Sequence, residues 1–112
     1  MSWFEGLENL TKINIPEGII KVREEICKNC SGLSSIIFPS TIEEIEDEAF
    51  YDCKSLKSIS FKSINPPQIY ENTFYNLPTD CTIYIPIGSL SEYISAEYYP
   101  DSNTYTYIEK QF

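Results

Sequence analysis

A 23-residue repeat is the feature that most constrains the fold of this chain. Leu10, Leu33 and Leu56 stand 23 residues apart twice, and a weaker fourth copy begins 24 residues later, at Asp80. Extending the register backwards places Phe4 in the middle of a preceding, incomplete copy. A fixed period of this length predicts a solenoid, because one repeat cannot bury its apolar face alone and must stack on its neighbours.

Each repeat is predicted to contain one short strand. Apolar side chains at alternate positions point inward and the residue between them points outward in four segments, Ile13-Asn14-Ile15, Ile36-Ile37-Phe38, Ile59-Ser60-Phe61 and Ile83-Tyr84-Ile85. A proline directly follows three of these strands. Proline has no N–H to donate, so strand pairing is expected to stop there and the chain to turn. A second apolar pair, such as Ile42 and Ile45, closes the other side of the repeat.

The repeat resembles a known family. Its pattern, Leu-x-x-Ile-x-Ile-Pro-x-x-Ile-x-x-Ile-x-x-x-Ala-Phe-x-x-Cys-x-x, is similar to that of the BspA-like leucine-rich repeat proteins, and residues 33–55 match it best, with Ala49-Phe50 and Cys53 in place. Three departures stand out: Cys27 replaces the phenylalanine, Lys62 replaces the strand-ending proline, and residues 63–69 carry an insertion.

Periodicity and resemblance together predict an α/β-type repeat solenoid. Stacked repeats place a parallel β-sheet on the concave face, with irregular or strand-like segments opposite. The resemblance implies a short right-handed leucine-rich-repeat coil, mostly β and irregular, with one C-terminal helix. The chain is predicted to be a single domain over residues 1–112: a partial repeat (3–9), three repeats (10–32, 33–55 and 56–79), and a final strand with a C-terminal cap (80–112).

The two ends of the solenoid differ in sequence. After Pro86 the period stops, and Ser89-Leu90-Ser91-Glu92 matches a capping box, which predicts a helix over 89–97. Leu90, Tyr93 and Ile94 are expected to share its apolar face, and a turn at 101–103 precedes a final strand over 104–109. The N-terminal half-repeat has no comparable cover. This predicts either that the chain is the C-terminal part of a longer array or that its N-terminal edge is covered, including by self-association.

The four cysteines allow two interpretations. Cys27 and Cys30 form a C-x-x-C motif, which with Cys53 and Cys81 could build a zinc or redox site. The repeat already explains three of the four positions as core positions, and free cysteine is among the most buried residue types. We therefore expect four free thiols in the core, although Cys30 and Cys53 should lie one turn apart and within disulfide reach.

Composition excludes several classes of function. The chain has 8 Lys and Arg against 17 Asp and Glu, a net charge of −9, which opposes binding to nucleic acid or anionic lipid. It has no histidine, so histidine-dependent catalysis and histidine-containing zinc sites are excluded. No apolar stretch approaches the roughly 20 residues that cross a bilayer, and no signal peptide is recognisable.

The acidic run at 43–48 is expected to be a solvated face and not a calcium or catalytic site. We also expect the protein to bind no cofactor and no metal.

Two groups of residues are candidates for binding. The first comprises the outward positions of the predicted concave sheet, namely Lys12, Asn14, Ser35, Ile37, Ser58, Ser60, Thr82 and Tyr84. Ile37 and Tyr84 are the best contact candidates because they are apolar with no role in the core. The second is the tyrosine cluster near the C-terminus, Tyr93, Tyr98, Tyr99, Tyr105 and Tyr107, which could stack on sugars or anchor a protein, although covering the last turn of the solenoid is the favoured role.

The sequence therefore favours a non-enzymatic recognition module for a protein or glycan partner. The family resemblance implies a secreted or cell-surface bacterial protein. A structural spacer or cap without its own ligand is the alternative, and a metal- or carboxylate-dependent enzyme is the least favoured.

Overall fold

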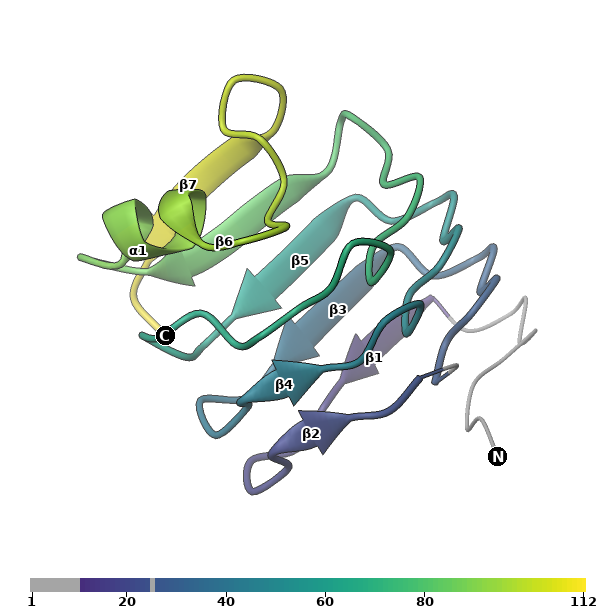
Figure 1. Ribbon diagram of the computed structural model, residues 1–112, viewed down its shortest axis with the longest axis horizontal. Coiled ribbons are helices and arrows are strands. Elements are labelled where there is room, and N and C mark those ends of the chain that lie inside the picture. Colours follow the sequence, from purple (N-terminus) through teal and green to yellow (C-terminus); the bar gives the residue numbers. More distant parts are fainter. Residues whose placement is uncertain (1–10, 25) are drawn as a thin grey trace.

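The computed structural model describes residues 11–24 and 26–112. Its main feature is one parallel five-stranded sheet in the order β1-β3-β5-β6-β7 (Figure 1). The strands are β1 (Lys12–Asn14), β3 (Ser35–Phe38), β5 (Ser58–Phe61), β6 (Thr82–Pro86) and β7 (Thr106–Lys110). Opposite lies a two-stranded sheet of β2 (Lys21–Val22) and β4 (Glu44–Ile45), and one helix, α1 (Leu90–Ser95), connects β6 to β7.

The strand register follows the repeat. Ile13 pairs with Ile36, Ile36 with Ile59, and Ile59 with Ile83, so equivalent residues of successive turns lie side by side. Leu33 and Leu56 are both fully buried, whereas Leu10, like Trp3, Phe4 and Leu7, lies outside the described residues. The predicted solenoid with its parallel sheet is confirmed. The prediction of an open N-terminal edge also falls outside the described residues.

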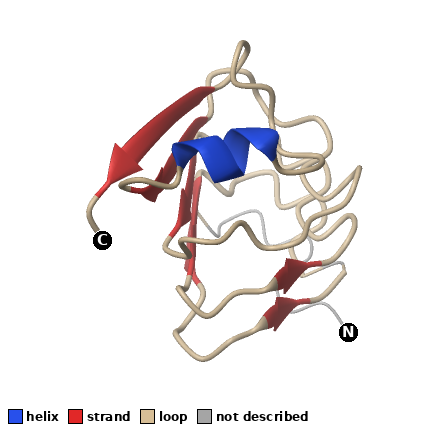
Figure 2. Ribbon diagram, turned by 60° about the vertical axis from the view of Figure 1, so that its left-hand side comes forward, coloured by secondary structure: helices blue, strands red, loops and turns tan. Residues whose placement is uncertain are grey.

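Aromatic side chains form columns within the core. Phe38 stacks on Phe61 with ring centroids 5.1 Å apart, and Phe50 stacks on Phe74 at 5.6 Å. Phe38 also meets Phe50 edge-to-face at 5.6 Å, which joins the sheet side of the core to the opposite side. Figure 2 shows the main sheet on one side of the coil and the two short strands, β2 and β4, on the other. Stacking of equivalent residues therefore packs the core between turns as well as within each turn.

The turns that lead into the main strands repeat a left-handed residue. Asn29, Asp52 and Asn76 occupy the same repeat position and have φ of 61°, 58° and 62°. Asparagine and aspartate tolerate this conformation better than other non-glycine residues. The Asn76 side-chain amide also donates to Asp52 Oδ1 at 2.9 Å, which links two successive turns. A short polar residue at this position thus allows each turn to reverse direction in the same way.

The C-terminal segment corrects three predictions. The period does not stop at Pro86, because β7 pairs with β6 in parallel and places Tyr107 beside Ile83, one more 24-residue step. The helix is shorter than predicted, and the capping box is wrong: Ser89 makes no side-chain cap and its Oγ donates to the Pro86 carbonyl at 2.6 Å. Glu109, brought close by β7, accepts instead from the backbone N–H groups of Gly88 and Leu90 at 2.9 and 3.1 Å.

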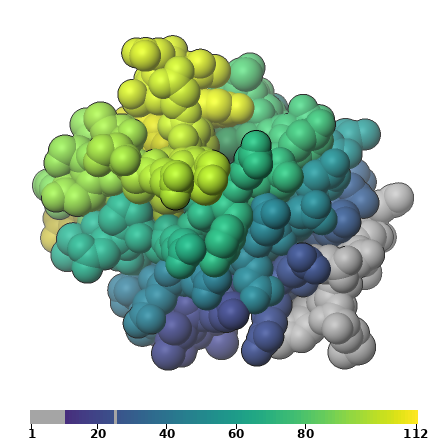
Figure 3. Space-filling model, in the orientation of Figure 1, coloured from purple at the N-terminus to yellow at the C-terminus, as the bar shows by residue number. Residues whose placement is uncertain are grey.

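The short helix buries one side chain. Tyr93 is fully buried, whereas Leu90 and Ile94, which were predicted to share its apolar face, remain 39% and 43% exposed. A six-residue helix has too few turns to cover the last strand completely. The C-terminal residues nevertheless cover one end of the stack, as the space-filling view shows (Figure 3).

Candidate functional site

The outer face of the main sheet brings the first group of candidate residues together. Register places Lys12, Ser35, Ser58 and Thr82 in one row across the strands, and Asn14, Ile37, Ser60 and Tyr84 in the next. β7 adds Thr106 to the first row and Ile108 to the second. We call this surface, with Lys110 at its edge, the outer sheet face. In β1, β3, β5 and β6 these side chains alternate with buried side chains that enter the core.

Exposure varies along the second row. Asn14 and Ile108 at its ends are exposed, whereas Ile37 and Tyr84 are half-buried. Ser60 lies between Ile37 and Tyr84 and is only 6% exposed, so it is not the contact residue that its outward position predicts. The small serine is covered because larger side chains flank it on both neighbouring strands. The surface in the middle of the row is therefore formed by Ile37 and Tyr84, which are apolar.

Charge on the outer sheet face differs from charge on the rest of the chain. None of the outward residues on the five strands is Asp or Glu, although the chain has a net charge of −9. Lys12 is exposed at one side of the face. At the other side the Lys110 ammonium lies 5.6 Å from the Tyr84 ring centroid and 5.5 Å from that of Phe112. Cation–π contacts of this kind hold the lysine against the aromatic surface.

Sequence reasoning missed three residues of this face, Thr106, Ile108 and Lys110. The signal that could have found them was the spacing of 24 residues from Thr82 to Thr106, the same as from Ser58 to Thr82. This signal is weak in the sequence because a helix replaces the usual second half of the repeat between β6 and β7.

Most of the tyrosine cluster is engaged within the chain. The hydroxyls of four tyrosines donate to backbone carbonyls: Tyr93 to Ser63 and Tyr99 to Pro67, both at 2.6 Å, Tyr105 to Leu77 at 2.6 Å, and Tyr107 to Pro100 at 2.7 Å. Burial raises the pKa of Tyr93, Tyr99 and Tyr107 above the ordinary phenol value. Tyr98 is different, being 51% exposed.

These hydroxyl bonds give the insertion at 63–69 a structural role. Its backbone supplies two of the four carbonyls, those of Ser63 and Pro67, so the insertion and the C-terminal cap are joined. Tyr93 also packs against Phe61 and Tyr99, with ring centroids 5.3 and 5.4 Å apart. For these tyrosines, the geometry therefore supports the structural role, which is to cover the last turn of the solenoid.

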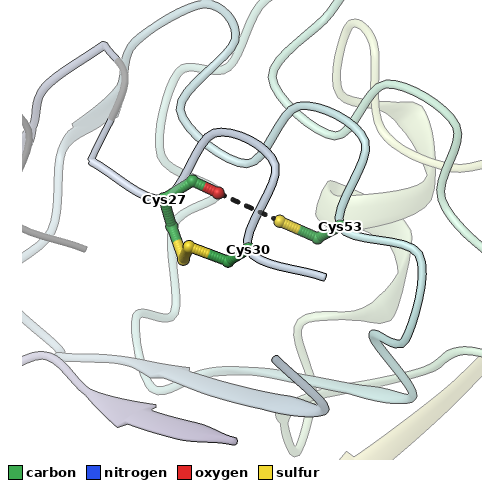
Figure 4. The surroundings of a disulfide bond; sticks show 3 residues. All are labelled: Cys27, Cys30 and Cys53. Carbon is green, nitrogen blue, oxygen red and sulfur yellow. Dashed lines mark hydrogen bonds between the residues drawn. A yellow bond between two sulfur atoms is a disulfide. The ribbon is translucent and has the colours of Figure 1, made fainter. Parts of the chain in front are cut away.

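The cysteines lie in the core as predicted, but the prediction of four free thiols is wrong. Cys27 and Cys30 form a disulfide, with their Cα atoms 5.3 Å apart, and both are fully buried (Figure 4). The tight turn through Asn29 brings these two residues within disulfide distance. Cys53 stays a thiol, and its Sγ donates to the Cys27 carbonyl at 3.2 Å. The one-turn neighbours Cys30 and Cys53 are therefore not the bonded pair.

The two remaining thiols, those of Cys53 and Cys81, are buried in the core. Burial raises the pKa of Cys53 to about 11 and that of Cys81 to about 12. The thiolate, which is the reactive form, is therefore nearly absent at neutral pH.

We expect thiol counting to distinguish the two pairs of cysteines. In denaturant without reductant, an alkylating reagent should modify two cysteines per chain, Cys53 and Cys81, and after reduction it should modify four. Mass spectrometry of the labelled peptides checks the assignment. Four modified cysteines before reduction would show that the disulfide is absent.

The acidic run at 43–48 serves contacts between turns. Lys21 lies 3.0 Å from Glu46 and 3.6 Å from Glu44, and Lys28 lies 3.0 Å from Glu48. The pKa of Glu46 is lowered, first by the hydrogen bond from the Glu24 backbone N–H and then by Lys21. Among the described residues, no group of three or more Cys, Asp or Glu side chains is arranged to hold a metal ion. The run therefore connects neighbouring turns on the face opposite the main sheet.

No helix within residues 11–24 and 26–112 has the length and the apolar character that crossing a membrane requires.

Comparison with known families agrees with the fold. A family model described as the BspA type leucine rich repeat region matches residues 1–109 in six copies. The chain belongs to this family. The match continues through β7, as expected if that strand is a further turn of this BspA-type solenoid. A search of curated proteins finds no similar sequence.

Proposed function

We propose that the outer sheet face of this BspA-type repeat protein binds a protein or glycan partner without catalysing a reaction. The observation that carries the proposal is the second row of the face, where Ile37, Tyr84 and Ile108 are apolar yet point away from the core. Apolar side chains that lie together on one surface outside the core are typical of a binding site.

The remaining residues of the face support the same proposal. Ser35, Ser58, Thr82 and Thr106 are small and offer hydroxyl groups, which allow close approach and hydrogen bonding. Lys12 and Lys110 supply positive charge, and the face has no carboxylate to oppose an acidic group on the partner. Leucine-rich-repeat families are generally non-enzymatic. The family resemblance favours a secreted or cell-surface setting, which is part of this proposal.

The size of the face predicts weak binding. Five strands about 4.8 Å apart, each presenting about 10 Å of its length, give roughly 200 to 300 Å². A standard protein interface buries about 800 Å² on each partner. One chain is therefore expected to bind with low affinity, and a larger repeat surface to bind more tightly.

Array binding tests the proposal. The labelled chain is applied to glycan and protein arrays beside an Ile37→Ala, Tyr84→Ala double variant. We expect this variant to lose at least about tenfold in affinity for any ligand found, since central aromatic contacts contribute most to binding. The matched control is Ile20→Ala with Tyr75→Ala, the same residue types at positions that are 53% and 47% exposed outside the outer sheet face. Equal binding by all three proteins would contradict the proposal.

A second candidate function is a structural cap or spacer with no ligand of its own. The hydrogen bonds that join the C-terminal tyrosines to the backbone of the preceding turn favour it, because they stabilise the end of the stack. If a protein containing this chain kept its full affinity for a partner when Ile37 and Tyr84 were changed to alanine, the structural function would be favoured.

A further inference from the structure

Lys62 departs from the repeat in a way that folding explains only in part. Pro16, Pro39 and Pro86 occupy the equivalent position of the other turns. The Lys62 backbone N–H donates to the Phe38 carbonyl at 3.1 Å, a bond that proline could not make. This bond accounts for the absence of proline, but it does not require a charged side chain.

Lys62 shares a row of the main sheet with a second lysine. The register of β5 and β6, continued beyond Ser60 and Tyr84, places Lys62 beside Pro86, and β7 places Lys110 on the other side of Pro86. Side chains alternate along a strand, so position 62, like position 60, is on the outer sheet face. Strands about 4.8 Å apart put the two lysine backbones roughly 10 Å from each other. Their long, flexible side chains can therefore contact one small ligand group from two sides.

Tyr84 on β6 lies between the strands that carry the two lysines. The Lys110 ammonium is 5.6 Å from the centroid of its ring. The Tyr84 hydroxyl has no hydrogen-bond partner among residues 11–24 and 26–112, in contrast to the hydroxyls of the four cap tyrosines. We call Lys62, Tyr84 and Lys110 the lysine subsite.

The acidic side chains of the described residues leave these two lysines unpaired. Neither Lys62 nor Lys110 forms an ion pair with any of them. The pKa of Glu17 is lowered mainly by hydrogen bonds from the Ser40 hydroxyl and backbone N–H, and Lys62 contributes least. Glu109, next to Lys110, accepts from backbone N–H groups at the start of α1. A partner's anionic group would therefore meet two ammonium groups without a competing carboxylate.

We propose that the lysine subsite binds the carboxylate of a uronic-acid residue in a glycan that lies along the outer sheet face. This inference rests on the proposed function and narrows the partner to an acidic glycan. Ammonium groups form strong, charge-assisted hydrogen bonds with a carboxylate. A sugar ring has an apolar face that suits Tyr84 and Ile37, and hydroxyls that suit the serines and threonines of the first row. A face of roughly 200 to 300 Å² suits a short saccharide better than a folded protein, which needs about 800 Å².

The net charge of −9 belongs to the whole chain. The acidic run at 43–48 includes β4, which lies in the sheet opposite the main one. Physiological salt screens exposed charges beyond about 8 Å, so the two nearby lysines decide the interaction once the glycan is in contact.

Paired probes test the subsite. A galacturonic acid tetramer and its methyl ester have the same sugar rings, but only the acid is charged, and NMR chemical shifts report the binding of each to the full chain. We expect the acid to bind at least about fivefold more tightly than the ester, a preference that salt should reduce. The largest shifts should occur at residues 60–62, 84–85 and 108–110.

Lysine variants show whether the preference arises at the subsite. Lys62→Gln with Lys110→Gln should lower the affinity for the acid to that for the ester. Lys54→Gln with Lys57→Gln, the matched control, removes the same charge from two exposed lysines outside the subsite and should keep the preference. Lys62→Arg with Lys110→Arg retains both charges and should keep most of it.

The outcomes separate this proposal from the proposed function. Equal affinity for acid and ester, no binding of either, or a preference that survives Lys62→Gln with Lys110→Gln would overturn the subsite. Tighter binding of a glutamate tetrapeptide than of the acidic tetramer would also overturn it, because the partner would then be an acidic protein segment. If the ester binds and loses affinity in the Ile37→Ala, Tyr84→Ala variant, the proposed function stands even where the subsite fails.

Discussion

Replacing Phe38 with alanine is expected to lower the free energy of unfolding by about 3–5 kcal/mol, the usual cost of removing a fully buried aromatic side chain. Phe38 is fully buried and contacts three aromatic rings: Phe61 at 5.1 Å, Phe50 at 5.6 Å and Phe74 at 6.3 Å between centroids. Phe38 belongs to the sheet side of the core and also contacts the opposite side. The cavity left by removing its ring would therefore affect several turns. Since small domains are stable by only about 5–15 kcal/mol, much of the stability would be lost.

Urea unfolding followed by circular dichroism measures this effect. Phe112→Ala is the matched control, because Phe112 is 46% exposed and its removal should change stability by less than about 0.5 kcal/mol. A loss below about 1 kcal/mol for Phe38→Ala would mean that the ring is not enclosed as described. Equal losses for the two variants would also contradict the packing.

Tyr93→Ala is expected to have a comparable effect, about 3–5 kcal/mol, through loss of the C-terminal cap. Tyr93 is the fully buried side chain of α1, and its hydroxyl donates to the Ser63 carbonyl at 2.6 Å. Tyr93→Phe keeps the ring but leaves that carbonyl without its partner, at a cost of about 1–3 kcal/mol. The order of stability should therefore be the unmodified chain, then Tyr93→Phe, then Tyr93→Ala.

Hydrogen exchange shows where this destabilisation acts. Amides of β7 should lose protection in Tyr93→Ala before those of β3 and β5, because α1 connects β6 to β7 and Tyr93 holds α1 on the core. Tyr98→Ala is the control, since Tyr98 is 51% exposed. Uniform loss of protection over all strands would instead indicate that the cap and the inner turns unfold as one unit.

The repeat predicted the inner turns of the solenoid well, for a physical reason. Side chains alternate along a strand, and each 23-residue copy carries the same alternation. Only one strand register therefore places Ile36 beside Ile59 in the core. The same register leaves Ile37 and Ser60 pointing outward. A shift by one residue would expose the entire inward set. The identity of the outer sheet face followed from this pattern over β1, β3, β5 and β6. Whether that face binds a partner stays a prediction.

Two of the features that sequence reasoning missed involve residues far apart in the chain, and one, the disulfide, is local. Glu109 caps a helix that begins 19 residues earlier, so the local capping box at Ser89 competed with a partner that only the fold brings close. Cys27 bonds to Cys30 and not to a cysteine of the next turn because the tight turn between them brings their Cα atoms to 5.3 Å. Ser60 is buried because residues on two other strands cover it.

The sequence by itself determined the period, the inward side chains and the family of this protein, since these depend on a local pattern repeated along the chain. Only the tertiary structure decided that β7 extends the sheet and that the tyrosine hydroxyls join the cap to the turn before it. Those features depend on the path by which about the last 30 residues return to the stack. The repeat no longer specifies that path, and side-chain contacts between residues far apart in the sequence determine it.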